Sequence, residues 1–146
     1  AGAHVITTAS AKNHALLKKI GADEVIDYHT TNFAEVLTDV DLVFDTMGGE
    51  VQKNSFDVLK PNTGRLVSIV GIEDKQLAAE KNVSAESIWL QPNGEQLQKI
   101  ADLMAAGKVK SIIGEVFPFS RQGIYDAHAL SETHHAVGKI VVQMAE

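Results

Sequence analysis

The stretch Asp41-Leu42-Val43-Phe44-Asp45-Thr46-Met47-Gly48-Gly49 carries the clearest structural signal in the chain. Its unbroken apolar run predicts a short strand buried on both faces, as in the centre of a parallel sheet. An acid, a hydroxyl and two glycines follow, where open α/β sheets bind their ligands. Glycines there let a ligand approach the backbone, because no Cβ is in the way. A helix expected from about Glu50 would offer free N–H groups to an anion, although an ordinary strand-to-helix turn has the same pattern.

The composition limits the class of protein. A chain of 146 residues with 45% hydrophobic residues has the size of one domain with a real core. Its 13 basic and 19 acidic residues give a net charge of -6, which argues against nucleic acid and anionic membranes as partners. The absence of cysteine excludes disulfides and thiolate metal sites and favours a reducing, cytoplasmic setting. The sequence contains neither an apolar run long enough to span a membrane nor an export leader.

Short strands alternate with helices along the first half of the chain. Strands are expected at residues 4–8, 25–26, 42–44 and 65–70, with helices at 11–20, after Asn32 and from Glu50. Because the links are short, this order predicts a parallel sheet with right-handed crossovers. The chain opens at Ala1-Gly2-Ala3, directly before the first expected strand, so we expect a fragment.

The rhythm changes after Gly71. A polar loop or loose helix is expected at 73–82, an edge strand at 83–90, a helix at 95–106, and a strand, a helix and a final strand over 112–144. The segments from about Lys110 are not expected to continue the alternation of strands and helices.

Four motifs, in register and together spanning nearly the whole chain, carry a family resemblance. They are Leu17-Lys18-Lys19-Ile20-Gly21-Ala22-Asp23-Glu24-Val25-Ile26-Asp27-Tyr28, Asp45-Thr46-Met47-Gly48-Gly49, Leu59-Lys60-Pro61-Asn62-Thr63-Gly64-Arg65-Leu66-Val67 and Gly138-Lys139-Ile140-Val141. Together they resemble the quinone oxidoreductase-like branch of the medium-chain dehydrogenase/reductase superfamily (zinc-type alcohol dehydrogenase-like).

The resemblance implies a Rossmann-type doubly wound α/β sheet, truncated at its start. The first strand, the glycine-rich turn and the first helix of that fold, with the catalytic domain, would lie upstream. Residues 1–109 would form a partial dinucleotide-binding domain, and residues 110–146 would return to the absent catalytic domain.

The residues at the end of the expected first strand indicate whether the cofactor is NADPH or NADH. An NAD-preferring fold carries an acid at this position for the ribose 2′-hydroxyl. Here Thr8 and Ser10 are followed by Lys12, and hydroxyls with a cation suit a 2′-phosphate. We therefore expect NADPH rather than NADH. Ser10 could equally be a plain helix cap, and Lys12 a solvated lysine.

The resemblance assigns further residues to the cofactor. Tyr28 would lie on the adenosine-phosphate side, unless it is only a half-buried aromatic. Residues Asp45, Thr46, Gly48 and Gly49 would lie along the ribose of the nicotinamide half. Backbone groups of Ser68, Ile69 and Val70 would face the nicotinamide, while the side chains of Ile69 and Val70 are expected to pack in the core. Gly138 and Lys139 resemble a motif near the cofactor cleft. Lys139 could equally be a lysine at a helix end, where its positive charge interacts favourably with the helix dipole.

The implied reaction is hydride transfer from the nicotinamide to a quinone, an enone or a similar carbonyl acceptor. The fragment alone is expected to be inactive, and no residue is nominated as catalytic. A non-catalytic nucleotide-binding or dimerisation module is the alternative, and a methyltransferase-like Rossmann domain is a weaker one. The six histidines show no metal-binding spacing, so no metal ligand is nominated, and a zinc ion would need ligands that this chain does not contain.

The expected edge strand at 83–90 indicates a partner. Its residues Ile88, Trp89 and Leu90 are costly to leave in water, and an unpaired edge is a template for another chain. Relatives pair this strand across a two-fold axis, which implies a homodimer.

Overall fold

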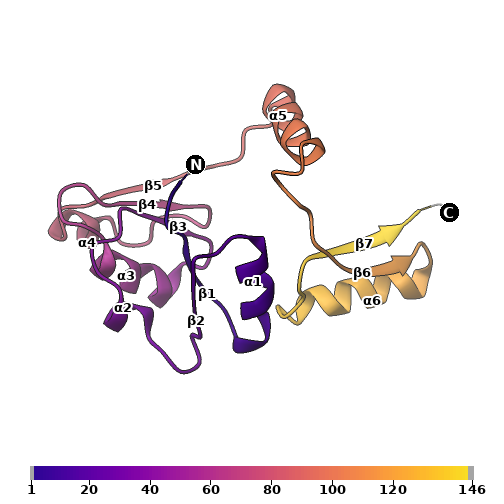
Figure 1. The fold of residues 1–146 in the computed structure, drawn as a ribbon, viewed down its shortest axis with the longest axis horizontal. Coiled ribbons are helices and arrows are strands. Elements are labelled where there is room, and N and C mark those ends of the chain that lie inside the picture. The colour runs from indigo at the N-terminus through magenta and orange to yellow at the C-terminus, as the bar shows by residue number, and fades with distance from the viewer. Residues whose placement is uncertain (1, 145–146) are drawn as a thin grey trace. The chain divides into compact units, whose positions relative to one another are not determined.

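The computed structural model describes residues 2–144, which divide into two compact units. The first unit ends at Pro92 and the second begins at Asn93 (Figure 1). Helix α5 (Gly94–Ala105) therefore falls within the second unit, whereas the sequence grouped it with the first part. The domain boundary expected between residues 109 and 110 stays a prediction about the natural protein.

The first unit alternates strands and helices, as the sequence predicts. Its elements are β1 (Ile6–Thr8), a 3-10 turn (Ala11–Asn13), α1 (His14–Ile20), β2 (Glu24–Ile26), α2 (Phe33–Val36), β3 (Leu42–Asp45), α3 (Gly49–Val58), β4 (Arg65–Ser68), α4 (Lys75–Glu80) and β5 (Ser84–Ser87). Gly21 ends α1 in the left-handed conformation, with φ of 115°, as expected for the residue after a helix. Residues 73–82, expected as a loop or loose helix, contain α4, which the Asp74 side chain caps.

The strands of this unit form two parallel sheets, β1-β2 and β3-β4-β5. A doubly wound sheet of the Rossmann type has the strand order 3-2-1-4-5-6. Strands β2 and β1 correspond to the pair 3-2, and β3, β4 and β5 correspond to 4-5-6. No strand within residues 2–144 lies paired between β1 and β3, where strand 1 of that order belongs. The pairing therefore confirms the α/β fold that the sequence predicts.

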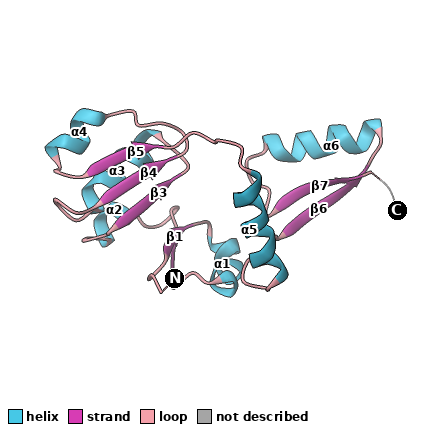
Figure 2. Ribbon diagram, turned by 90° about the horizontal axis from the view of Figure 1, so that it is seen from above, coloured by secondary structure: helices cyan, strands magenta, loops and turns pink. Residues whose placement is uncertain are grey.

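The core of the first unit lies between the three-stranded sheet and its helices. Phe56 and Leu59 from the region of α3, Leu66 of β4 and Ala78 of α4 are buried together. Helix α3 lies against one face of this sheet, as Figures 1 and 2 show. Because successive side chains of a strand point to opposite faces, Val43 and Asp45 of β3 point toward α3.

The expected burial of β3 on both faces is wrong. Leu42 and Phe44, which point away from α3, are 58% and 60% exposed. The physical reason is that α3 and α4 cover only one face, so the apolar run has a partner on one side alone. Val51 of α3 and Ile20 of α1 are also exposed.

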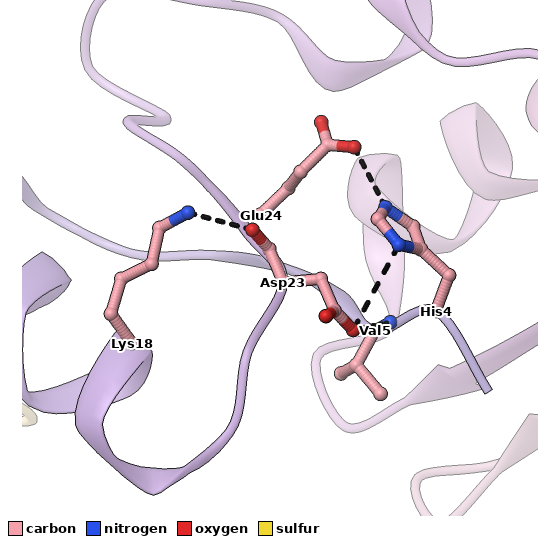
Figure 3. A network of polar contacts seen from close by, with 5 residues as sticks. All are labelled: His4, Val5, Lys18, Asp23 and Glu24. Atoms are coloured by element: carbon pink, nitrogen blue, oxygen red, sulfur yellow. Dashed lines mark hydrogen bonds and ion pairs between the residues drawn. The ribbon is translucent and has the colours of Figure 1, made fainter. Parts of the chain in front are cut away.

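A polar cluster joins the beginnings of β1 and β2 to α1 (Figure 3). The His4 ring lies 2.7 Å from Glu24 Oε1, and the backbone N–H of Val5 donates to Asp23 Oδ2 at 2.8 Å. The Lys18 ammonium donates to the backbone carbonyl of Asp23 at 2.6 Å. These groups are exposed, so their pairing fixes the geometry of the strand ends more than it stabilises the fold.

The second unit contains α5, β6 (Ile113–Pro118), α6 (Arg121–Glu132) and β7 (Lys139–Gln143). Strands β6 and β7 pair in parallel, and α6 packs on both. The strand, helix and final strand expected over 112–144 are therefore confirmed, and they form a β-α-β unit with a sheet of its own. The Ser120 side chain caps α6 by accepting from the N–H of Gly123 at 3.0 Å, as serine commonly does at the start of a helix.

No helix within residues 2–144 combines the length and the apolar character needed to cross a bilayer.

Candidate functional site

The carboxyl ends of β3 and β4 meet because of the register of the sheet. Parallel pairing places Asp45 opposite Ser68, the last residues of the two strands. Both side chains point to the face covered by α3, and both are buried. The Ser68 hydroxyl donates to Asp45 Oδ2 at 2.8 Å. The loop after β3 (residues 46–49) and the loop after β4 (residues 69–74) therefore start side by side.

Asp45 organises the loop after β3. Its Oδ1 atom accepts hydrogen bonds from the backbone N–H groups of Met47 and Gly48, both at 3.0 Å. Its Oδ2 atom accepts from Gln52 Nε2 at 2.7 Å, besides the bond from Ser68. The carboxylate is only 3% exposed. We therefore interpret the Asp45 side chain as the residue that shapes the loop, whereas its predicted contact with the cofactor ribose stays a prediction.

Two effects oppose each other at this carboxylate. Burial raises the pKa of Asp45, because it disfavours the charged form. The hydrogen bonds from Gln52, Gly48, Met47 and Ser68 lower that pKa, and together they outweigh burial, so the net pKa lies below the usual value. Asp45 is accordingly ionised at neutral pH, and each of its four donors makes a charge-assisted bond.

The two glycines after β3 have different roles. Gly48 has φ of 70°, and a Cβ there would lie 3.1 Å from Glu73 Oε1 and 3.3 Å from Val70 Cγ2. Gly49 also has a positive φ, but a Cβ there would meet nothing within 4 Å. Gly48 thus allows the two loops to approach each other, while the backbone at Gly49 is open to an approaching ligand.

The start of α3 is not free for an anion in the way the sequence predicts. The N–H of Gly49 donates to Glu73 Oε1 at 2.9 Å, so a carboxylate of the chain itself caps this helix. A negative group is favourable there because the helix dipole is positive at its start. Nothing in the sequence around Glu73 reveals this contact, because Gly49 lies 24 positions away.

Gln52 is the second residue that sequence reasoning missed. It is 1% exposed and lies on the buried face of α3 with Ser55 and Phe56. Positions 52, 55 and 56 have the i, i+3, i+4 spacing of a helical stripe. A stripe anchored on Phe56 includes Gln52, whereas a stripe anchored on the exposed Val51 leaves it out.

The loop after β4 exposes apolar side chains. Ile69 and Val70 were expected to pack in the core, and this is wrong, because both are exposed. The N–H of Ile69 donates to the Asp45 carbonyl at 3.1 Å, and the N–H of Val70 donates to Ser68 Oγ at 3.1 Å. Thr46 and Met47 of the neighbouring loop are also exposed. The two loops thus expose these side chains to solvent, while the buried Asp45 and Ser68 hold the loops from beneath.

The residues predicted for the 2′-phosphate follow β1. Thr8 and Lys12 are exposed and Ser10 is half-buried. Ser10 occupies the cap position of the 3-10 turn, but its side chain makes no cap hydrogen bond. It accepts only a long bond, 3.4 Å, from Asn13 Nδ2. Lys12 has no ion-pair partner within residues 2–144, so its charge is available to a ligand.

The remaining predicted residues lie apart from these loops in the chain. Tyr28 follows β2 and is half exposed, with its ring centroid 4.3 Å from that of His29. Gly138 and Lys139 belong to the second unit. A Cβ at Gly138 would lie 2.6 Å from the carbonyl oxygen of Ile112, and the N–H of Lys139 donates to that oxygen at 2.7 Å. Gly138 therefore lets β7 begin close to the start of β6.

The described residues do not bring together a metal site. No group of three or more His, Asp or Glu side chains within residues 2–144 could hold a metal ion, and the chain has no cysteine. The donor set therefore does not fit a zinc ion, and no chemical step is assigned to one.

The parallel strand order, with exposed loops at the carboxyl ends of β3 and β4, defines an α/β domain of the dinucleotide-binding type. The model of the family described as zinc-binding dehydrogenase matches residues 20–142, and the chain belongs to this family. The resemblance to quinone oxidoreductase-like medium-chain dehydrogenases/reductases is thereby confirmed.

Known proteins agree with this assignment. The chain is 32% identical to the chloroplast envelope quinone oxidoreductase homolog of Arabidopsis thaliana, over 98% of this chain and 46% of that protein. It is 30% identical to an NADPH-dependent alkenal/one oxidoreductase of the same plant, over 94% of this chain and 33% of that protein. The solved quinone oxidoreductase of Coxiella burnetii superposes with a TM-score of 0.88 at 37% identity, over 99% of this chain and 46% of that one. The chain thus spans less than half the length of these relatives.

Proposed function

We propose that this chain is the cofactor-binding portion of an NADPH-dependent oxidoreductase that transfers a hydride to a quinone, an enone or a similar carbonyl acceptor. The observation that carries the proposal is the pair of loops after β3 and β4, held together by the buried Asp45 and Ser68. The relatives support it, because they are named as a quinone oxidoreductase homolog and an NADPH-dependent alkenal/one oxidoreductase.

The chain's own residues would bind and orient the cofactor. The open backbone at Gly49 and the exposed groups of Thr46, Ile69 and Val70 would line the nicotinamide half. When bound, the nicotinamide supplies the hydride, and the protein supplies orientation and the surrounding field. The apolar side chains of Ile69 and Val70 would exclude water from that side of the ring.

The preference for NADPH over NADH rests on the corner after β1. The exposed ammonium of Lys12 has no partner in the described part of the chain, and Thr8 and Ser10 add hydroxyls. A 2′-phosphate would gain charge-assisted hydrogen bonds from such a set, whereas a 2′-hydroxyl would gain little. An acid that would bind the 2′-hydroxyl and repel the phosphate is absent from residues 7–12.

A homodimer through residues 83–90 is the proposed assembly. Strand β5 pairs only with β4, so one of its edges is free within the described residues. The three residues after it are exposed, with Trp89 at 88%. A two-fold axis would pair the same patch on both subunits and bury these side chains.

A fluorescence titration tests the proposed function. The natural protein is titrated with NADPH, NADH and S-adenosylmethionine, and its turnover is followed with a quinone and an enone. We expect NADPH to bind most tightly and to be oxidised by one of the acceptors. Binding of NADPH without turnover would favour the non-catalytic nucleotide-binding module, and preferential binding of S-adenosylmethionine would favour the methyltransferase-like alternative.

A further inference from the structure

We propose that Gln52 is a positioning residue for the cofactor, which acts from the buried side of the site by locking the loops after β3 and β4 into one arrangement. The inference rests on the proposed function, because it gives these two loops the task of holding a nicotinamide dinucleotide. It concerns a side chain that would not touch the cofactor itself.

The carboxamide of Gln52 links the loop after β4 to Asp45, the residue that shapes the loop after β3. Its Nε2 atom donates to Asp45 Oδ2 and to the carbonyl oxygen of Gly71, both at 2.7 Å. Its Oε1 atom accepts from the backbone N–H of Glu73 at 3.0 Å. Gly71 and Glu73 belong to the loop after β4, whereas Asp45 ends β3 and accepts from the N–H groups of Met47 and Gly48 in the loop that follows. One side chain therefore couples the two loops through Asp45.

The contacts use both donor hydrogens and one acceptor position of the glutamine side chain. The two hydrogens of Nε2 match the two acceptors at 2.7 Å, and a third acceptor, Ser68 Oγ, lies at 3.4 Å. The partners also fix the orientation of the amide, since a flipped group would place an oxygen against a carboxylate and a carbonyl. Neither a glutamate nor a methionine of similar size can reproduce this pattern at neutral pH.

A second contact closes the linkage into a ring. Glu73, whose N–H donates to Gln52, accepts in turn from the N–H of Gly49 through its side chain at 2.9 Å. The ring thus runs from Asp45 through Gln52 and Glu73 to Gly49, and returns to Asp45 through the loop after β3. Asp45 and Gln52 are the buried members of this ring, and the contact between Glu73 and Gly49 is exposed. Because buried polar groups are costly to leave unpaired, the Asp45–Gln52 part of the ring favours one relative position of the two loops.

Gln52 and the exposed residues of the two loops lie on opposite sides of those loops, which distinguishes a positioning role from direct binding. Gln52 is 1% exposed and lies on the buried face of α3. Met47, Ile69 and Val70 on the same two loops are exposed and face solvent. A ligand would therefore meet the loops from the outer side, while Gln52 holds them from the inner side. Such preorganisation raises affinity because fewer conformations are lost on binding.

The test compares Gln52→Met and Gln52→Glu with Phe56→Leu in the natural protein. Phe56 lies one turn further along α3, is buried in the apolar core and contributes to stability without contacting either loop through a polar group. Phe56→Leu thus serves as the control for a general loss of stability. All variants are measured at a temperature where circular dichroism shows them folded.

The first readout is the dissociation constant for NADPH, followed by fluorescence. We expect Gln52→Met to weaken binding about tenfold, the effect of leaving buried hydrogen-bonding groups unpaired beside the site. We expect Phe56→Leu to leave the constant unchanged within about twofold, because substitutions without shared partners act independently. Equal binding by wild type and Gln52→Met would overturn the inference and leave the proposed function intact.

The second readout is the pH dependence of Gln52→Glu. Its carboxylate would face Asp45, with Glu73 as the other acidic neighbour, and such a pair takes up a proton more readily than an isolated carboxyl group. The protonated pair restores one donor, so the affinity of this variant relative to wild type should recover as the pH is lowered from 8 to 6. Gln52→Met has no such proton and should show no recovery. Parallel pH profiles for the two variants would contradict the inference.

Amide hydrogen exchange of the free protein gives a readout that does not depend on the cofactor. Gln52→Met should accelerate exchange at Gly48 and Glu73 together, whereas Phe56→Leu should change them little. If only one of these amides responds, the two loops are not coupled and the inference fails. A wild-type protein that binds neither NADPH nor NADH would overturn the proposed function, and the positioning role would fall with it.

Discussion

Replacing Asp45 by asparagine is the most informative perturbation of the buried support. All four hydrogen-bonding partners of the carboxylate are donors, two on each oxygen. Asparagine keeps one oxygen, which can still accept from the N–H groups of Met47 and Gly48. Its amide nitrogen must then face Ser68 and Gln52, which donate in the wild-type protein.

The two partners differ in their ability to adapt. The Ser68 hydroxyl can rotate and accept instead of donating. Gln52 cannot turn its amide, because Nε2 also donates to Gly71 and Oε1 accepts from Glu73. Asp45→Asn therefore loses a charge-assisted hydrogen bond and sets two donors against each other. We expect it to reduce the free energy of unfolding by about 3 kcal/mol.

Urea unfolding at pH 7, followed by far-ultraviolet circular dichroism, measures this loss. Asp41→Asn is the control, because that carboxylate lies at the other end of β3, is largely exposed and pairs with Lys60. It should change the unfolding free energy little. A loss of unfolding free energy below about 1 kcal/mol for Asp45→Asn, with an unchanged slope of that free energy against urea concentration, would contradict the supporting role of Asp45. Such a loss is no larger than that caused by an average substitution.

At acidic pH, the difference in unfolding free energy between wild type and Asp45→Asn should become smaller. Burial raises the pKa of Asp45 but the hydrogen bonds outweigh it, so the pKa is lower in the folded than in the unfolded protein. A group of this kind contributes stability above its unfolded-state pKa of about 4, and the contribution is lost as the pH falls through the folded-state value. If the difference in unfolding free energy between the two proteins is the same at pH 6 and at pH 2.5, the lowered pKa of Asp45 is contradicted.

Three other substitutions test separate parts of the account. Gly48→Ala should destabilise the protein by about 1–2 kcal/mol, because φ is 70° and the new methyl group would meet Glu73 and Val70, whereas Gly94→Ala, with open space around it, should be nearly neutral in thermal unfolding. Lys12→Glu should weaken NADPH binding about tenfold or more and leave NADH binding nearly unchanged, as titration of both would show. Trp89→Glu should shift the protein from dimer to monomer in light-scattering chromatography, whereas a wild-type protein that is already monomeric at micromolar concentration would contradict the proposed interface.

The elements of the fold could be predicted from the sequence because their signals are local. The apolar run at 42–44 indicates β3, Gly21 ends α1, and Ser120 begins α6. The order of short strands and helices then suffices to predict a parallel α/β sheet. Burial could not be predicted in the same way, since an apolar residue such as Phe44 is buried only where another element covers its face.

The hydrogen bonds of Gln52 and Glu73 that hold the candidate site could not be predicted from the sequence, for a related reason. Asp45 and the glycines stand out in a motif, whereas Gln52 and Glu73 are ordinary polar residues. The bonds of Gln52 to Gly71 and to Glu73, and of Glu73 to Gly49, join residues 19 to 24 positions apart. Their importance depends on the register that places β3 beside β4. Only the folded chain brings these atoms together.

A crystal structure of the natural protein with NADPH bound would show whether the loops after β3 and β4 form one wall of the nicotinamide site. We expect the nicotinamide half to lie against residues 46–49 and 69–71, with the Gln52 carboxamide still bonded to Asp45 and Gly71. A dinucleotide bound with its nicotinamide away from both loops would contradict this expectation.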